Sequence, residues 1–294
     1  MLAAGLGARL RPLTASRAKP SLPVAGPSLI ARLVTILSGH GITEVMVNLH
    51  YRPETITAIL GDGAPFGVAV RYSWEQPLLG SAGGPRRAFA LGASERLWLV
   101  NGDTLCDMPL GPIADAHGQS DALVTMVVIP NPDPARYGGV LVDEDVVTGF
   151  TPRGAGPSWH FVGLQVAERD AFDGLADGVP GDSVTSLYPA LIARRRGSVR
   201  AFRTEARFHD IGTPSDYLAA CLELAGGDPA LLVASDARIH AGATLDRTVV
   251  WEDVEVGADA RLREAIVMNG ARVPAHFGAE RQIVAPDLTL TQIV

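Results

Sequence analysis

Near its start the chain reads Leu2-Ala-Ala-Gly-Leu-Gly-Ala-Arg-Leu-Arg-Pro-Leu-Thr14, a glycine-containing turn followed by basic side chains. Gly5 and Gly7 lack a Cβ, so the backbone amides of this loop can converge on an anion. Arg9 follows at once, and Lys19, the only lysine in the sequence, lies ten positions further on. Amides that cradle phosphate oxygens, together with two cations, suit the binding of a triphosphate.

Beyond this loop, apolar runs alternate with helical patterns over roughly the first 225 residues. Four runs end in turn residues, as strands do; they span residues 44–49, 67–72, 97–101 and 123–129. Helical patterns occupy residues 27–40, 52–60, 83–91 and 112–117. Alternation of strand and helix predicts a doubly wound α/β domain with a mostly parallel sheet, which binds ligands at the carboxyl ends of its strands.

The pattern changes after a last predicted helix at residues 213–224. Aliphatic residues then recur every five or six positions and repeat every 17 residues, at Ile239, Leu245, Val250, Val256, Leu262, Val267 and Val273. This period predicts a short left-handed β-helix of hexapeptide repeats, with an irregular β-rich tail as the alternative. We therefore expect a catalytic domain over residues 1–225 and a β-helix tail over residues 226–294.

Composition narrows the class of protein. With 47% hydrophobic and 19% charged residues in 294, the chain can bury a large core and is not disordered as a whole. A net charge of −7 argues against binding nucleic acid or anionic membranes by bulk electrostatics. Cys106 and Cys221 form no disulfide framework or metal motif. Since we find no signal peptide or membrane-spanning run, we expect a cytoplasmic protein.

Five further motifs follow the N-terminal loop in chain order: Leu78-Leu-Gly-Ser-Ala-Gly-Gly84, Asn101-Gly-Asp103, Tyr137-Gly138, Phe161-Val-Gly-Leu164 and His209-Asp-Ile-Gly-Thr-Pro214. Together these six segments resemble the sugar-1-phosphate nucleotidylyltransferase family. Members of that family make an NDP-sugar and pyrophosphate from an NTP and a sugar 1-phosphate, with Mg²⁺ as cofactor. The terminal hexapeptide repeats also match the C-terminal part of several members.

The resemblance implies a role for each matching residue. Arg9 and Lys19 would be catalytic, and Asp103 and Asp210 would hold Mg²⁺. The nucleotide would lie against Ala3, Ala4, Gly5, Gly7, Glu75, Gly80, Ser81 and Gly102. The sugar phosphate would contact Tyr137, Gly138, Arg153 and Gly163.

The residues by themselves leave alternatives open. Asp103 and Asp210 lie 107 positions apart, and each also suits the capping of a turn or helix. For Arg9 and Lys19 the alternative is a solvated surface cation. Glu75 is either an acceptor for the N–H groups of a nucleobase or a solvated glutamate at the end of a strand.

The sequence departs from the family pattern in three places. Pro152-Arg-Gly154 stands where many members have Glu-Lys-Pro, and Phe161 stands where many have asparagine. Members also carry several apolar residues before the glycine loop, as a first central strand, whereas Met1-Leu2 opens this sequence. We expect a true start upstream of Met1, since loss of a central strand would expose its neighbours.

Within the family, Glu75, the Tyr137-Gly138 turn and the tail resemble the mannose-1-phosphate guanylyltransferase branch. The alternatives are a thymidylyl- or uridylyltransferase acting on glucose 1-phosphate or an amino-sugar 1-phosphate, and a non-catalytic regulatory homologue that binds an NDP-sugar. The expected partners are therefore an NTP and a sugar 1-phosphate, with no nucleic acid and no membrane. The tail is expected to mediate homo-oligomer formation.

Overall fold

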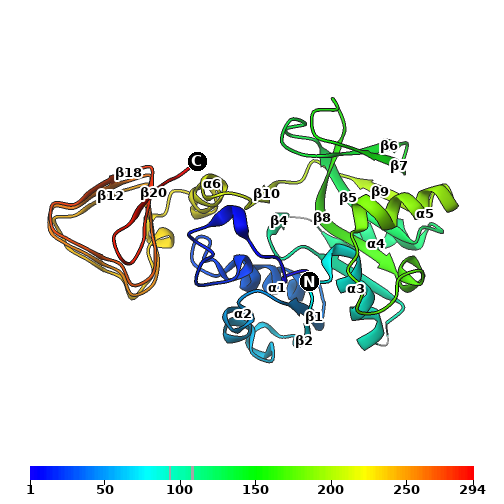
Figure 1. Cartoon of the computed structure of the whole chain (residues 1–294), viewed down its shortest axis with the longest axis horizontal. Coiled ribbons are helices and arrows are strands. Elements are labelled where there is room, and N and C mark those ends of the chain that lie inside the picture. Colours follow the sequence, from blue (N-terminus) through cyan, green and yellow to red (C-terminus); the bar gives the residue numbers. More distant parts are fainter. Residues whose placement is uncertain (93, 107–108) are drawn as a thin grey trace. The chain divides into compact units, whose positions relative to one another are not determined.

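The computed structural model describes residues 1–92, 94–106 and 109–294 (Figure 1). Packing groups them into two compact units. The first unit comprises residues 1–5, 33–53 and 60–208, and the second comprises residues 6–32, 54–59 and 209–294. The predicted boundary at residue 225 divides the chain differently, because it follows sequence order and not packing. Within the described ranges, no helix is long and apolar enough to cross a membrane.

The first unit contains two sheets. In the smaller sheet, β1 (Glu44–Leu49) pairs in parallel with β2 (Ala69–Trp74). The larger sheet has six strands in the order β3-β8-β5-β9-β7-β6. These strands are β3 (Arg96–Val100), β5 (Val124–Pro130), β6 (Gly139–Asp143), β7 (Val146–Thr151), β8 (Trp159–Glu168) and β9 (Val199–Arg203). Two short strands, β4 (Thr104–Cys106) and β10 (Phe208–Asp210), lie outside both sheets.

The prediction of a mostly parallel sheet is wrong for the six-stranded sheet. Strand β8 runs antiparallel to both β3 and β5, and β7 runs antiparallel to both β6 and β9. The pair β5 and β9 is parallel. For β6 and β7 the physical reason is that a short turn joins the two strands with no helix between them, and strands joined in this way pair antiparallel.

Leu2 lies between the ends of β1 and β3. It forms parallel bridges to Asn48 on one side and to Asn101 on the other. Its N–H donates to the Val100 carbonyl at 2.8 Å, and its own carbonyl accepts from the Gly102 N–H at 2.8 Å. These bonds fix the start of the glycine loop between two strand ends.

Five helices lie close to their predicted ranges: α1 (Leu29–Gly39), α2 (Pro53–Leu60), α3 (Gly80–Leu91), α4 (Leu110–Gly118) and α6 (Pro214–Ala225). A sixth helix, α5 (Tyr188–Arg194), has no counterpart in the prediction. The core of the first unit packs Phe89 of α3 and Tyr188 of α5 against Leu99, Val124 and Met126 of the six-stranded sheet.

The tail of the second unit is a three-faced coil, drawn in orange and red in Figure 1. Each face stacks strands from successive coils in parallel, offset by 17 residues, which confirms the predicted period. The faces are β11 (Arg238–Ile239), β14 (Glu255–Val256) and β17 (Arg272–Val273); β12 (Thr244–Asp246), β15 (Arg261–Arg263) and β18 (Gly278–Glu280); and β13 (Val249–Val250), β16 (Ile266–Val267) and β19 (Gln282–Val284). Strand β20 (Leu290–Gln292) closes the coil antiparallel to β19.

The same spacing governs the corners and the interior of the coil. Arg247, Glu264 and Arg281 each adopt a left-handed conformation, with φ of 48°, 48° and 51°. Aliphatic side chains such as Val256 and Leu262 fill the inside and are 3% and 1% exposed. The tail is thus held by stacked apolar layers, as a coil whose repeats contact only their neighbours requires.

Candidate active site

The N-terminal turn of the second unit brings Lys19 against Gly7. Gly7 has φ +59° and caps the short 3₁₀ helix Ala8–Leu10. A Cβ at Gly7 would lie 3.0 Å from Thr14 Cγ2 and 3.3 Å from Lys19 Cβ, so both conformation and space call for glycine. The Thr14 hydroxyl closes the turn by donating to the Gly7 carbonyl at 2.8 Å. Lys19 is only 7% exposed, and a lysine buried to this degree is normally held by partners.

Arg9 and Asp210 converge on Gly212 within the same unit. A Cβ at Gly212 would lie 3.3 Å from each of three atoms: Arg9 Nη1, Asp210 Oδ2 and Asp216 Oδ2. The predicted phosphate clamp and the predicted second metal ligand therefore border one small glycine. Any larger residue there would displace the charged groups.

The segment carrying Asp210 is fixed by the start of α6. The Asp216 carboxylate accepts hydrogen bonds from the Thr213 N–H at 2.8 Å and from the Thr213 hydroxyl at 2.9 Å. The Asp216 N–H in turn donates to Thr213 Oγ1 at 3.2 Å, which completes a capping box. Thr213 is thus the N-cap of α6 and Asp216 its partner within the first turn, whereas Asp210 precedes the helix and is not its cap.

In the first unit, Glu75 is buried and organises the loop around it. Its Oε1 accepts from Asn48 Nδ2 at 2.7 Å, and its Oε2 accepts from the Leu79 N–H at 2.8 Å. Asn48 Oδ1 accepts from the Ala3 N–H at 2.5 Å, which links this pair to the glycine loop. Glu75 is 4% exposed, so the alternative of a solvated strand-end glutamate is wrong. Because both carboxylate oxygens already accept hydrogen bonds, the geometry favours loop positioning over recognition of a nucleobase.

The loop of residues 78–84 packs tightly against residues 179–183. Gly80 has φ +74°, and a Cβ there would lie 2.6 Å from the Gly181 carbonyl oxygen. The Ser81 hydroxyl donates to Asp182 Oδ2 at 3.1 Å and accepts from the Ser183 N–H at 2.9 Å. Sequence reasoning missed Asn48, Gly181 and Asp182, since each lies far along the chain from the loop that it orders.

We expect Gly83→Ala to destabilise the fold. The added Cβ would lie 2.5 Å from the Val179 carbonyl oxygen, a backbone atom that cannot move alone, so a cost of about 1–3 kcal/mol is expected. Gly111→Ala, in α4 with nothing within 4 Å, is the matched control and should be neutral or stabilising by about 0.5–1 kcal/mol. Urea denaturation measures both; equal midpoints for the two variants would contradict the close packing of this loop.

The turn that carries Asp103 is fixed by Gly102 and Gly163. The Asn101 N–H donates to the Gly163 carbonyl at 2.8 Å. Gly163 has φ +79°, and a Cβ there would lie 2.6 Å from Asn101 Nδ2, while a Cβ at Gly102 would lie 2.9 Å from the Leu2 carbonyl oxygen. Packing alone therefore explains these two glycines. Asp103 itself is half-buried, and its Oδ1 accepts from the Thr104 hydroxyl at 3.2 Å.

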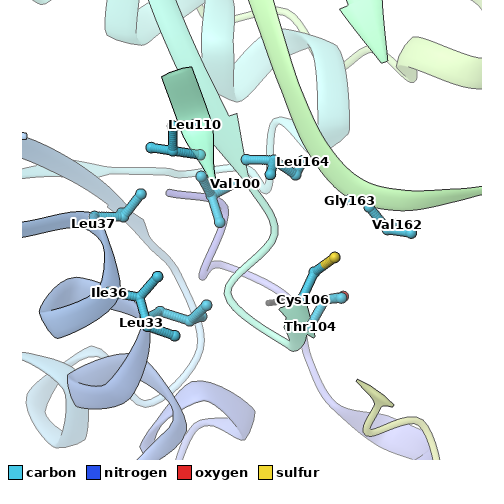
Figure 2. A pocket seen from close by; sticks show the side chains of 10 residues that line it. All are labelled: Leu33, Ile36, Leu37, Val100, Thr104, Cys106, Leu110, Val162, Gly163 and Leu164. Carbon is cyan, nitrogen blue, oxygen red and sulfur yellow. The ribbon is translucent and has the colours of Figure 1, made fainter. Parts of the chain in front are cut away.

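A small apolar cavity lies next to this turn, and Val100 and Thr104 on either side of the turn belong to its lining. It has a volume of about 30 Å³, and Figure 2 shows aliphatic side chains from α1 and β8 around it, together with Cys106. Its lining includes Leu33, Leu37, Val100, Val162 and Leu164. A space of this size holds about one water molecule, so it is not a nucleotide pocket.

An aromatic cluster surrounds the predicted sugar-contacting turn. The rings of Tyr137 and His160 lie 4.4 Å apart, and Phe208 packs edge-on against His160 at 4.9 Å. The Gly154 N–H donates to the Pro134 carbonyl at 2.7 Å, which places the exposed turn of Arg153 beside the turn of Tyr137 and Gly138. His160 is a further residue that sequence reasoning missed, since it precedes Phe161 and carries no motif of its own.

We expect His160 to make the protein less stable in acid. The pKa of its imidazole is lowered from 6.5 to about 4, chiefly by burial; a hydrogen bond with the Gly138 backbone opposes the shift, and the charge of Arg136 contributes to it. As the pH falls below 6.5 the unfolded chain takes up the proton first, so stability is lost down to about pH 4. Urea midpoints at neutral pH and near pH 4 should differ less in His160→Phe than in the wild type. An equal acid-induced drop of the urea midpoint in both proteins would exclude His160 as the cause of the acid sensitivity.

Candidate metal-binding side chains are few in the part of the chain that the structure describes. Across residues 1–92, 94–106 and 109–294, no group of three or more His, Cys, Asp or Glu side chains is arranged to hold a metal ion. Asp103 belongs to the first unit and Asp210 to the second. Hard oxygen donors in such small number fit Mg²⁺, which binds through one or two carboxylates together with substrate phosphates and water.

Comparison with known proteins identifies the family of this chain. Residues 1–226 match the family described as nucleotidyl transferase, and the chain belongs to that family. Residues 229–282 match the GlmU-like C-terminal hexapeptide family, which confirms the prediction of a hexapeptide tail. Among named relatives, the mannose-1-phosphate guanylyltransferase of Mycobacterium tuberculosis is 32% identical over 295 residues, covering 96% of this chain and 82% of that protein.

More distant proteins extend the likeness. The mannose-1-phosphate guanyltransferase of Kluyveromyces lactis is 28% identical over 245 residues, covering 79% of this chain and 67% of that protein. The crystal structure of HddC from Yersinia pseudotuberculosis superposes with a TM-score of 0.66 at 24% identity, covering 76% of this chain and 97% of that chain. A putative glucose-1-phosphate thymidylyltransferase from Bacillus anthracis superposes with a TM-score of 0.68 at 21% identity, covering 77% of this chain and 94% of that chain. The two structures establish the fold.

Proposed function

We propose that this protein transfers a guanylyl group from GTP to mannose 1-phosphate, releasing pyrophosphate and GDP-mannose. The observation that carries the proposal is the 32% identity across 96% of the chain with a mannose-1-phosphate guanylyltransferase. The convergence of Arg9 and Asp210 on Gly212, and of Lys19 on Gly7, supports it, since these are the charges that the reaction needs.

The chemistry is an in-line displacement at phosphorus. An oxygen of the sugar phosphate forms a bond to the α-phosphorus of the NTP while the bond from that phosphorus to the bridging oxygen breaks, and the electron pair leaves with pyrophosphate. No covalent enzyme intermediate is needed, so positioning and charge neutralisation supply the acceleration. Arg9 neutralises the departing pyrophosphate, and Lys19 orients the α-phosphate and the sugar phosphate.

The ammonium of Lys19 and the guanidinium of Arg9 have different tasks. The compact ammonium of Lys19, held by burial against the Gly7 turn, offers a point charge where two phosphates approach each other. The planar guanidinium of Arg9 is exposed, and its fork can pair with two oxygens of the leaving group at once. Backbone amides near Gly5, where a Cβ would meet nothing within 4 Å, complete the phosphate cradle.

Asp103 and Asp210 would hold Mg²⁺. When bound, the ion supplies charge neutralisation at the non-bridging phosphate oxygens. The two carboxylates are kept in place by their own turns: Gly102 and Gly163 fix the turn of Asp103, and the α6 capping box fixes the segment of Asp210.

The sugar side is held by the aromatic cluster and by Arg153. The exposed Arg153 can pair with the sugar phosphate in place of the lysine that many family members carry. Ala3, Ala4, Gly80 and Ser81 shape the nucleotide side, with Asn48 and Glu75 acting behind them. We further propose that the three-faced tail winds as a left-handed β-helix and mediates self-association.

Pyrophosphate release in the presence of Mg²⁺ tests the proposal. GTP, dTTP, UTP, ATP and CTP are each offered with mannose 1-phosphate and with glucose 1-phosphate. We expect the GTP and mannose 1-phosphate pair to be used with the highest kcat/KM. A preference for dTTP or UTP with glucose 1-phosphate would keep the reaction class and overturn the substrate assignment. Absence of pyrophosphate release from all ten pairs, with NDP-sugar binding still detected by calorimetry, would identify a regulatory homologue.

A further inference from the structure

Trp251 of the tail touches both chain segments that carry the phosphate-binding charges. It follows β13, is 1% exposed, and lies perpendicular to the ring of Tyr217, with ring centroids 6.2 Å apart. Its indole N–H donates to the Tyr217 hydroxyl at 2.8 Å, and that hydroxyl donates to the Pro23 carbonyl at 2.6 Å. The guanidinium of Arg17 lies 4.6 Å from the centre of the Trp251 ring.

These contacts fall at informative positions of the chain. Arg17 stands two residues before Lys19, in the loop that also carries Arg9. Tyr217 lies in α6, whose first residue follows the Asp210–Thr213 segment directly. One tail side chain therefore ties the loop of residues 6–28 to the segment of residues 209–217, and all of these residues belong to the second unit.

We propose that Trp251 is a positioning residue for the phosphate site, so that the hexapeptide tail is part of the scaffold of the active site and serves more than self-association. The inference rests on the proposed function in naming the site that is positioned. Trp251 touches neither phosphate nor metal in this proposal. It acts by keeping Arg9, Lys19 and Asp210 in one arrangement through the two segments that carry them.

The chemistry of the contact favours a specific link over general packing. An indole N–H can only donate, so the Tyr217 hydroxyl accepts from Trp251 and uses its own proton to donate to the Pro23 carbonyl. The donor and acceptor roles of all three groups are therefore fixed. Burial raises the pKa of Tyr217 well above 10, which keeps its proton in place at working pH. Arg17 adds a cation–π contact and an ion pair with Glu252 at 3.1 Å.

The packing around the contacts of Trp251 with Arg17 and Tyr217 is open on one side. A cavity of about 470 Å³ lies beside it, lined by Arg17, Ser21, Thr55, Glu252 and Asn269 among others. The loop and the tail therefore do not meet as a continuous packed surface here. After loss of Trp251, the ion pair of Arg17 with Glu252 would still join the loop to the tail on that side.

Kinetics of Trp251→Leu separate positioning from stability. We expect KM for the NTP to rise and kcat/KM to fall about tenfold, because small misplacements of aligned groups are costly. Leu262→Ala is the matched control, since it removes packing from the tail interior, where Leu262 is 1% exposed, without touching either segment. Its kinetics should stay within about twofold of the wild type. Tyr217→Phe, which keeps the ring and removes both hydrogen bonds, should shift KM in the same direction as Trp251→Leu.

Amide hydrogen exchange supplies a readout that does not depend on activity. In Trp251→Leu, exchange should quicken in residues 6–28 and 209–217, whereas Leu262→Ala should leave both segments as protected as in the wild type. Equal effects of the two variants, in kinetics or in exchange, would overturn the proposal and leave Trp251 a stability residue. If the wild type proves inactive, the proposed function fails, and the exchange data still decide whether Trp251 holds the two segments.

Discussion

Arg9→Ala is expected to lower kcat for pyrophosphate release by about 100- to 1,000-fold, because it removes a charge aimed at the departing pyrophosphate. Arg9 is exposed, so its loss leaves no buried cavity, and thermal unfolding should be unchanged. Its Nη1 borders Gly212 beside Oδ2 of Asp210, the carboxylate that the proposal assigns to the metal. Stopped-time assays of pyrophosphate at saturating substrates measure the effect.

Arg11→Ala is the matched control for Arg9→Ala. Arg11 is an exposed arginine of the same loop, two positions further on, at the end of the short helix Ala8–Leu10. Its loss should change kcat by less than about threefold, since it has no assigned contact with phosphate. Equal losses in the two variants would mean that the loop needs only general positive charge. An Arg9→Ala enzyme with near-normal kcat would remove Arg9 from the mechanism.

Asp103→Asn and Asp210→Asn are each expected to lower kcat by about 100-fold, because each substitution would remove one anionic ligand from the proposed Mg²⁺ site. The amide keeps the shape of the carboxylate, so the turn around Asp103 and the start of α6 should remain folded. A rise in the Mg²⁺ concentration needed for half-maximal rate should accompany the lower kcat. Mg²⁺ titrations of both variants test this expectation.

The double variant and a surface control sharpen this test. The proposal makes both aspartates ligands of one ion, so Asp103→Asn combined with Asp210→Asn should cost little more than either change alone. Asp115→Asn, at an exposed position of α4, should behave as the wild type. Turnover within threefold of the wild type in Asp103→Asn would exclude that residue from the metal site.

The charged residues of the candidate site were selected from local motifs, and their assignment to the site stays a prediction. Gly7, Arg9 and Lys19 fall within a short stretch whose turn geometry follows from glycine, and the structure packs Lys19 back on Gly7. The repeat of the tail could also be predicted, because a 17-residue period in the sequence corresponds to one turn of the stacked coil. Local spacing carries this information whatever the rest of the chain does.

The direction of the strands and the contacts between residues far apart in the chain could not be predicted from the sequence in the same way. The apolar run of β8 has the composition of any buried strand, and nothing in its period shows that it runs antiparallel between β3 and β5. The sequence shows Glu75 only as a polar residue at the end of a strand. In the structure it is buried, and Asn48, 27 positions earlier, donates a hydrogen bond to one of its carboxylate oxygens. Trp251 carries no motif at all, and its importance appears only where α6 and the N-terminal loop meet it.

Transfer of the α-phosphate of GTP to mannose 1-phosphate is the most direct test. The protein is incubated with Mg²⁺, mannose 1-phosphate and GTP labelled at the α-phosphate, and the products are separated. We expect the label to appear in GDP-mannose, with one unlabelled pyrophosphate released for each molecule formed. Label that stays in GTP, in a preparation that binds GDP-mannose by calorimetry, would contradict the catalytic assignment and favour a regulatory protein.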